Sequence, residues 1–138
     1  MTIERLQPYL LSLFRFVTGL IFVHYGVAKL FKFPPVEMFE EVTPFSLWGA
    51  AGMIEFVFGG MLMLGLLTRP VAFILSGEMA FAYFIEHFPH SFFPVINEGG
   101  LAIVLCFGCL YLAASGGGPI SLDAMLGSRT RPAGLPRS

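Results

Sequence analysis

The chain has 138 residues, of which 56% are hydrophobic and 12% are charged, and its formal net charge is -1. A soluble domain carries about 25% charged residues, so the composition excludes an ordinary water-covered globule. No cluster of Lys and Arg offers a surface for nucleic acid, and two cysteines are too few for a disulfide framework or a structural zinc site. The length limits the chain to one domain.

Long apolar runs predict helices that cross a bilayer, for which about 20 helical residues are needed. Four runs approach this length, at about residues 10–30, 47–67, 70–88 and 99–114. Prolines at 34 and 35 end the first run, and a glycine run followed by Pro119 ends the fourth. We therefore predict an all-α, integral membrane four-helix bundle over residues 1–127, followed by a disordered cytoplasmic tail at residues 128–138.

The distribution of basic residues predicts the orientation of this bundle. Four crossings place both termini on one side, together with the connection between the second and third runs. That side carries six arginines, whereas the other side carries Lys29 and Lys32. By the positive-inside rule, we expect both termini to be cytoplasmic.

Three of the charged residues within the predicted spans stand out: Arg15, Glu55 and Glu78. Each costs about 2.5–3.5 kcal/mol at a helix centre unless it has a partner or a wet cavity. A helical projection places charged and small side chains on one face of each of the first two helices. The face of the first helix consists of Arg15, Gly19, Phe22, Gly26 and Lys29. The face of the second helix consists of Trp48, Ala51, Gly52, Glu55 and Gly59. We expect both faces to contact other helices.

Two interpretations of these charges stay open. In the first, Arg15 forms a structural ion pair with Glu55 or Glu78 and sets the register of the helices. In the second, Glu55 or Glu78 carries a proton or binds a ligand, which makes both of them, with His24, candidate catalytic residues. His24 lies 180° from Arg15 on the projection, so the two side chains cannot face the same neighbour.

An aromatic cluster at the end of the third run offers a candidate cofactor site. Phe81 and Phe84, with His87 and with His24 of the first run, could hold a quinone ring. For His24 the alternatives are a structural or interfacial position and a role as a metal or haem ligand. The same aromatic residues are also typical of a belt at the headgroup level. His87 and His90 form an H-x-x-H pair in a loop, to which Glu86 or Glu98 could add a carboxylate, but this signal is weak and we expect no metal site.

Cys106 and Cys109 form a C-x-x-C motif in the fourth run. Such a motif can cycle between dithiol and disulfide. Both cysteines, however, belong to a stripe of small residues with Gly99, Ala102 and Ala113, which favours close helix packing as their role.

Several motifs together resemble the DoxX family, over about residues 10 to 125. The first helix carries the run TGLIFVHYGVAKL at residues 18–30. The second carries GMIE at 52–55 and LGLLTR at 64–69, and the third carries EMAFA at 78–82, followed by His87. The fourth begins after NEGG at 97–100 and ends in LYLAASGGGPISLD at 110–123. Each motif is weak alone, but their order along the chain is specific.

The resemblance implies a multi-pass protein of the bacterial inner membrane. Some members of the family are similar to the membrane subunit of thiosulfate:quinone oxidoreductase, and others associate with thiol and superoxide defence proteins. The chain departs from the family pattern at the start of the fourth helix, where Gly100 replaces a common glutamate and Glu98 lies two positions earlier.

Two classes of function follow. The first is a redox-associated membrane subunit, linked to a quinone or to thiol and sulfur chemistry, and active only with a protein partner. The second is a non-catalytic component that anchors or assembles a partner, or that binds a lipophilic small molecule. In both, the bilayer is the surrounding partner, a protein complex or a homo-oligomer is expected, and nucleic acid is not.

Overall fold

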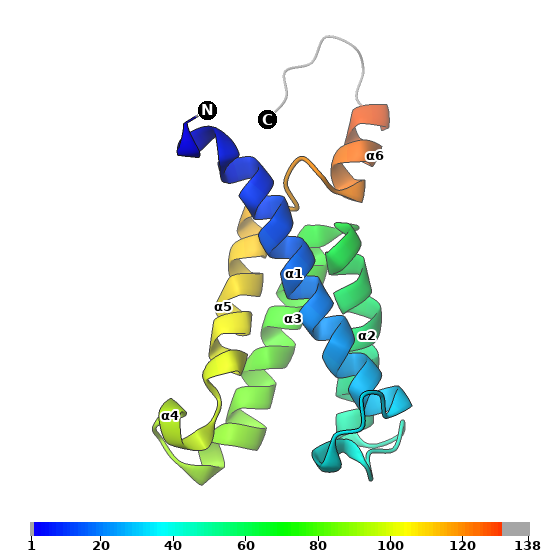
Figure 1. Ribbon diagram of the computed structural model, residues 1–138, viewed down its shortest axis with the longest axis vertical. Helices are drawn as coiled ribbons and strands as arrows, with labels where there is room; N and C mark the ends of the chain where they lie inside the picture. The colour runs from blue at the N-terminus through cyan, green and yellow to red at the C-terminus, as the bar shows by residue number, and fades with distance from the viewer. Residues whose placement is uncertain (1, 131–138) are drawn as a thin grey trace.

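The computed structural model describes residues 2–130, and these residues form helices joined by short loops (Figure 1). Four long helices dominate the structure. They are α1 (Ile3–Phe31), α2 (Leu47–Leu64), α3 (Thr68–Ala82) and α5 (Gly100–Ser115). The shorter elements are η1 (Glu37–Phe39), η2 (Tyr83–His87), η3 (Phe88–His90), α4 (Pro94–Asn97) and α6 (Leu122–Thr130). No strand occurs among the described residues, which confirms the all-α class.

The helix ends follow from local chemistry. Ser46 caps α2 by accepting a hydrogen bond from the Gly49 N–H at 3.0 Å. Gly65 ends α2 in the left-handed region, with φ of 74°, three residues earlier than the run of apolar residues predicted. The start of α1 also differs from the prediction, because the helix begins at Ile3 and not near residue 10. Pro8 lies within its first turns.

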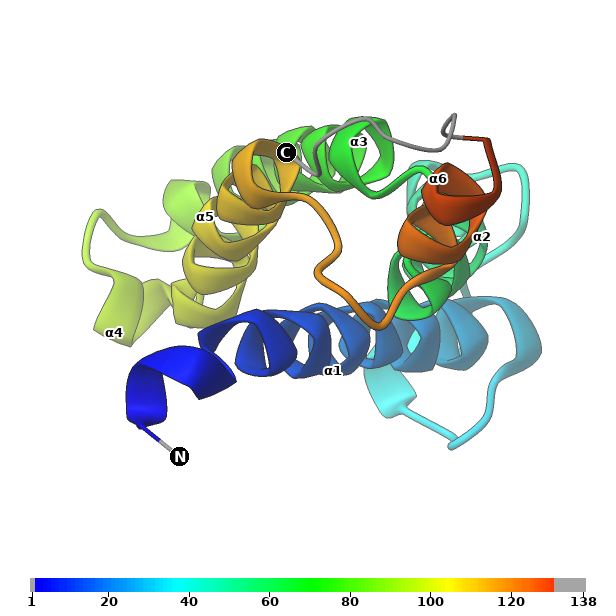
Figure 2. The same cartoon turned by 90° about the horizontal axis from the view of Figure 1, so that it is seen from above.

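The long helices pack as two pairs. α1 lies along α2, and α3 lies along α5, while α2 and α3 share a smaller contact. Figure 1 shows the start of α1 and all of α6 at one end of the molecule, and the α1–α2 loop and α4 at the other. We call these the terminal end and the loop end. Viewed from above, α1 runs across one side of the molecule and α3 lies on the opposite side (Figure 2).

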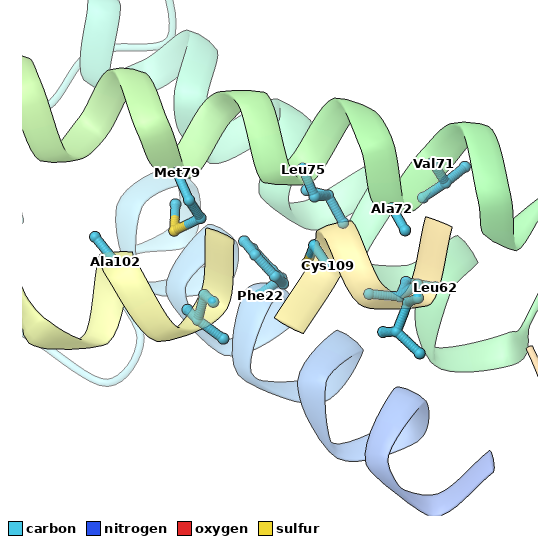
Figure 3. Close-up of a cluster of buried hydrophobic side chains, with 10 residues drawn as sticks. Phe22, Leu62, Val71, Ala72, Leu75, Met79, Ala102 and Cys109 are labelled. Atoms are coloured by element: carbon cyan, nitrogen blue, oxygen red, sulfur yellow. The ribbon is translucent and has the colours of Figure 1, made fainter. Parts of the chain in front are cut away.

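The core lies where the two pairs meet. Figure 3 shows side chains from all four long helices gathered there, among them Phe22, Leu62, Leu75 and Cys109, each at most 1% exposed. Many large apolar side chains point outward instead, such as Phe73 of α3 at 65% exposure. An apolar exterior of this extent suits hydrocarbon and not water.

Three helices are long and apolar enough to cross a bilayer: Ile3–Phe31, Leu47–Leu64 and Thr68–His90. The fourth apolar helix, Gly100–Ser115, has 16 residues and spans about 24 Å. The structure thus establishes several apolar helices, while the count of four crossings and the orientation stay predictions. Of the predicted disordered tail, residues 128–130 continue α6 as helix, and the remainder lies outside the described residues.

Candidate functional site

The contact between α1 and α2 brings two backbones together through glycine. A Cβ atom added to Gly26 would lie 2.6 Å from the backbone nitrogen of Phe56, and one added to Gly59 would lie 2.7 Å from the Cβ of Phe22. No larger side chain fits at either position. The predicted small-residue faces of the first two helices therefore face each other.

This close antiparallel contact sets which charges meet. It brings Gly26 beside Gly52 and Phe56, one turn from Glu55, and it brings Gly19 beside Gly59. Lys29, one turn beyond Gly26, has its Cβ 3.0 Å from a Cβ added to Gly52, and its side chain reaches Glu55 one turn away. Its Nζ atom donates to the two Glu55 oxygens at 2.8 and 3.0 Å. The side chains of Lys29 and Glu55 are 9% and 2% exposed, so the pair is almost completely buried.

Two aromatic rings enclose the Lys29 ammonium on its other side. Nζ lies 5.5 Å from the centroid of the Phe39 ring and 5.6 Å from that of Trp48. Both distances allow a cation–π interaction. Phe39 comes from η1 and Trp48 from the first turn of α2, so the α1–α2 loop completes the surroundings of this cation.

Glu78 of α3 brings a second carboxyl group to the same place. Its side chain lies close enough to those of Glu55 and Lys29 to interact electrostatically with both. Its Oε2 atom is buried, and no hydrogen-bond partner for it lies within the described part of the chain. Three helices thus meet in one group of titratable side chains, which we call the buried carboxylate centre: Lys29, Glu55 and Glu78.

The chemistry of this centre follows from its donors and acceptors. Two carboxyl groups can hydrogen-bond to each other when one of them carries a proton, because ionised carboxylates are acceptors only. If one of the two carboxyl groups is protonated, the charge of the other carboxylate is balanced by the Lys29 ammonium, and the centre has no net charge. The centre can therefore hold a proton inside an apolar bundle and exchange it with a neighbouring group.

Arg15 lies elsewhere, and the structure does not pair it with Glu55 or Glu78. Its guanidinium donates to the carbonyl of Gly117 at 2.5 Å and to that of Met63 at 3.4 Å. The cause is the register described above, which carries Arg15 about four turns along α1 from Lys29. The ion pair in this structure joins Lys29, not Arg15, to Glu55.

A second polar group ties the terminal end together. Asp123 of α6 accepts the backbone N–H groups of Leu67 and Thr68 at 2.7 and 2.8 Å, which caps the start of α3. Arg69 donates to the carbonyls of Ala113 and Ala114 at the end of α5. These bonds join helix ends that are distant in sequence, so the motifs at residues 64–69 and 116–123 have a structural role.

The other candidate residues are separated from the centre. His24 is exposed and lines an open groove of about 670 Å³ with apolar residues of α1 and with Phe33 and Pro34. Phe81 and Phe84 are 71% and 62% exposed and do not line that groove. His87 shares a 2.9 Å hydrogen bond with the Asn97 carbonyl, which holds the loop before α4. Among the described residues, no set of three His, Cys, Asp or Glu side chains could bind a metal ion.

The two cysteines lie in the α3–α5 contact. Cys109 is fully buried, and Cys106 is half-buried with its Sγ atom 3.5 Å from the Ser76 hydroxyl. Ser76 also donates to the Cys106 carbonyl at 2.8 Å. Both thiols thus contribute small side chains to a helix contact.

Lys29 is the residue whose role sequence reasoning missed, although it was placed on the correct face. The signal was available in the two glycine patterns. The four glycines Gly19, Gly26, Gly52 and Gly59 set an antiparallel register in which the Lys29 Cβ lies 3.0 Å from a Cβ added to Gly52, one turn from Glu55, whereas Arg15 falls near Gly65.

The fold and the site define a multi-helix membrane protein with a buried ion pair between its first two helices. The sequence matches the model of the DoxX family over residues 10–88. The chain belongs to the DoxX family. It is similar to an uncharacterized protein of Haemophilus influenzae, with 40% identity over 126 residues, covering 88% of this chain and 93% of that relative. No solved structure matches the chain.

Proposed function

We propose that this chain is a multi-pass subunit of a redox-linked complex in the bacterial inner membrane, and that its buried carboxylate centre exchanges a proton with a bound quinone. In this proposal the four apolar helices cross the membrane and both termini are cytoplasmic. The proposal is supported above all by one observation: the carboxyl groups of Glu78 and Glu55 interact inside an apolar bundle, and Lys29 forms an ion pair with Glu55.

The residues present suit a quinone in one specific respect. The buried Oε2 atom of Glu78 has no hydrogen-bond partner among the described residues, so it is available to a ring oxygen of a ligand. A quinone, when bound, supplies two-electron chemistry that requires protons. The chain's own part is to hold one proton between Glu78 and Glu55, and to keep Glu55 in place through Lys29.

The arrangement of the centre supports different roles for the two glutamates. Glu55 accepts two hydrogen bonds from Lys29 and is 2% exposed, which makes it the fixed member of the pair. Glu78 lies in the smaller contact, between α2 and α3, and its Oε2 atom has no hydrogen-bond partner among the described residues. We therefore assign the exchange of the proton to Glu78 and the orientation of its carboxyl group to Glu55.

The test compares Glu78→Gln with Glu86→Gln, a matched change of a half-buried glutamate in η2. Both variants and the wild type are purified in mild detergent with any associated proteins, and the bound lipids are identified by mass spectrometry. We expect the wild type and Glu86→Gln to retain a quinone, and Glu78→Gln to lose it and to lose quinone-dependent turnover while still assembling.

Two results would contradict the proposal. Full turnover in a correctly assembled Glu78→Gln variant would remove the proposed role of this carboxyl group. Absence of quinone from every preparation, with loss of assembly and activity together in Glu78→Gln, would instead favour the accessory role, in which the centre only holds the helices in register.

A further inference from the structure

Lys32 has an unusual set of partners directly after α1. Its backbone is in the left-handed region, with φ of 58°. Its ammonium group donates to three backbone carbonyls: that of Lys29 at 3.2 Å, that of Phe39 at 2.6 Å and that of Val42 at 2.5 Å. One carbonyl belongs to the last turn of α1 and two belong to the α1–α2 loop, so Lys32 fastens this loop to the end of the helix.

The loop fastened in this way covers the Lys29–Glu55 pair. Phe39, whose carbonyl accepts from Lys32, is only 6% exposed and places its ring over the Lys29 ammonium. Its ring lies 5.9 Å from that of Trp48, which flanks the same ammonium. The two rings separate the ion pair from the surface of the loop.

A hollow lies against Trp48, one of the two rings of this aromatic cover. It has a volume of about 320 Å³ and is open to the surface, and its walls are Met38, Glu41, Val42, Ser46 and Trp48. Trp48 is thus common to the hollow and to the Lys29 surroundings. Val42 supplies both a wall of the hollow and a carbonyl for Lys32.

We propose that the buried carboxylate centre communicates with water through this hollow, and that Lys32 is a positioning residue that keeps the entrance closed. When the three hydrogen bonds of Lys32 break, Phe39 and Trp48 separate and the Lys29 ammonium becomes reachable from the hollow. The exposed Glu41 carboxylate at the mouth then gives protons a first acceptor. That protons pass through this entrance rests on the proposed function, whereas the entrance itself is inferred from geometry alone.

The sequence makes this proposal directly measurable, because its two lysines are Lys29 and Lys32. In Lys32→Gln, Lys29 is the one lysine left to react with an amine-selective N-hydroxysuccinimide ester. The rate of Lys29 modification is measured by mass spectrometry on protein reacted in detergent. We expect this rate to be about tenfold or more higher than in the wild type, because the charge-assisted hydrogen bonds that hold the loop closed are lost. Lys32→Arg, which keeps the charge and the donors, should retain most of the protection.

Two further variants make the outcome decisive even if Lys32→Gln fails to fold. Phe39→Ala removes the ring but keeps the backbone carbonyl that Lys32 binds, and it should also expose Lys29. Phe45→Ala, in the same loop and 102% exposed, should leave the rate unchanged. Modification of Lys29 as slow as in the wild type, in folded Phe39→Ala or in folded Lys32→Gln, would overturn the proposal. No quinone enters this measurement, so its failure and that of the proposed function can be told apart.

Discussion

Arg15 and Gly117 lie 102 residues apart in the chain, and a 2.5 Å hydrogen bond joins the guanidinium of the first to the carbonyl of the second. This bond fastens α1 to the turn that follows α5 at the terminal end. The Lys29–Glu55 pair fastens α1 to α2 toward the loop end. Two cations on one helix face therefore have different partners, and their substitution should have different consequences.

The first prediction concerns these two cations. Lys29→Met leaves Glu55 buried without its partner, which should lower the free energy of unfolding by about 3–5 kcal/mol. Adding Glu55→Gln should recover much of this loss. Both effects are measured by heating the protein in detergent and quantifying the protein that stays folded by size-exclusion chromatography.

Arg15→Met provides the contrast. Because Arg15 binds carbonyl groups, Glu55→Gln should not rescue it. Equal rescue of Arg15→Met and Lys29→Met by Glu55→Gln would show that the two cations share a partner, against the geometry described here.

A second prediction tests the contact between α1 and α2. A Cβ at Gly26 would lie 2.6 Å from a backbone atom of Phe56, so Gly26→Ala should separate the helices and lower the melting temperature. Gly60→Ala is the matched control, since nothing lies within 4 Å of its added Cβ. That change should be neutral or stabilise by up to about 1 kcal/mol, because alanine favours a helix more than glycine does. A similar response at both positions would contradict the packing.

A third prediction concerns the cap that Asp123 provides to α3. Asp123→Ala removes the acceptor for two backbone N–H groups and should cost about 0.5–2 kcal/mol of stability. Asp123→Asn keeps one acceptor oxygen and should cost less. Glu98→Ala, at an exposed carboxylate, serves as the control. If Asp123→Ala melts like Glu98→Ala, the cap contributes nothing.

The fourth prediction separates packing from redox chemistry at the cysteines. Because Cys109 is fully buried and Cys106 contacts Ser76, replacement of both by alanine should preserve assembly and whatever turnover the complex shows. Cys109→Leu should destabilise the α3–α5 contact by about 1–3 kcal/mol through overpacking. Complete loss of turnover in a fully assembled double alanine variant would assign the thiols a redox role.

The fifth prediction is topological. Reporter fusions after Gly127 and at Thr68 should both report a cytoplasmic location, and fusions near Glu40 or Ser91 should report the opposite side. An external location for the fusion after Gly127 would mean that Gly100–Ser115, the shortest of the apolar helices, does not cross the membrane or that the orientation is reversed.

The sequence by itself determined the class of the protein and the faces of its helices. A charged fraction of 12% excludes a water-covered surface. Apolar runs with proline and glycine at their ends predict the long helices to within a few residues, except at the start of α1 and at the end of α3, where η2 follows. The 3.6-residue period placed Gly26, Lys29 and Glu55 on contact faces, since each face depends on a single helix alone.

The tertiary structure decided which of these faces meet and at what height. A helical period has no information on the axial offset between two helices; here the offset is set by glycine contacts and by the length of the α1–α2 loop. Because of this offset, Glu55 pairs with Lys29 and not with Arg15. It also brought Phe39 and Glu78 to the same ion pair, because their positions depend on a loop and on a third helix whose packing no local pattern specifies.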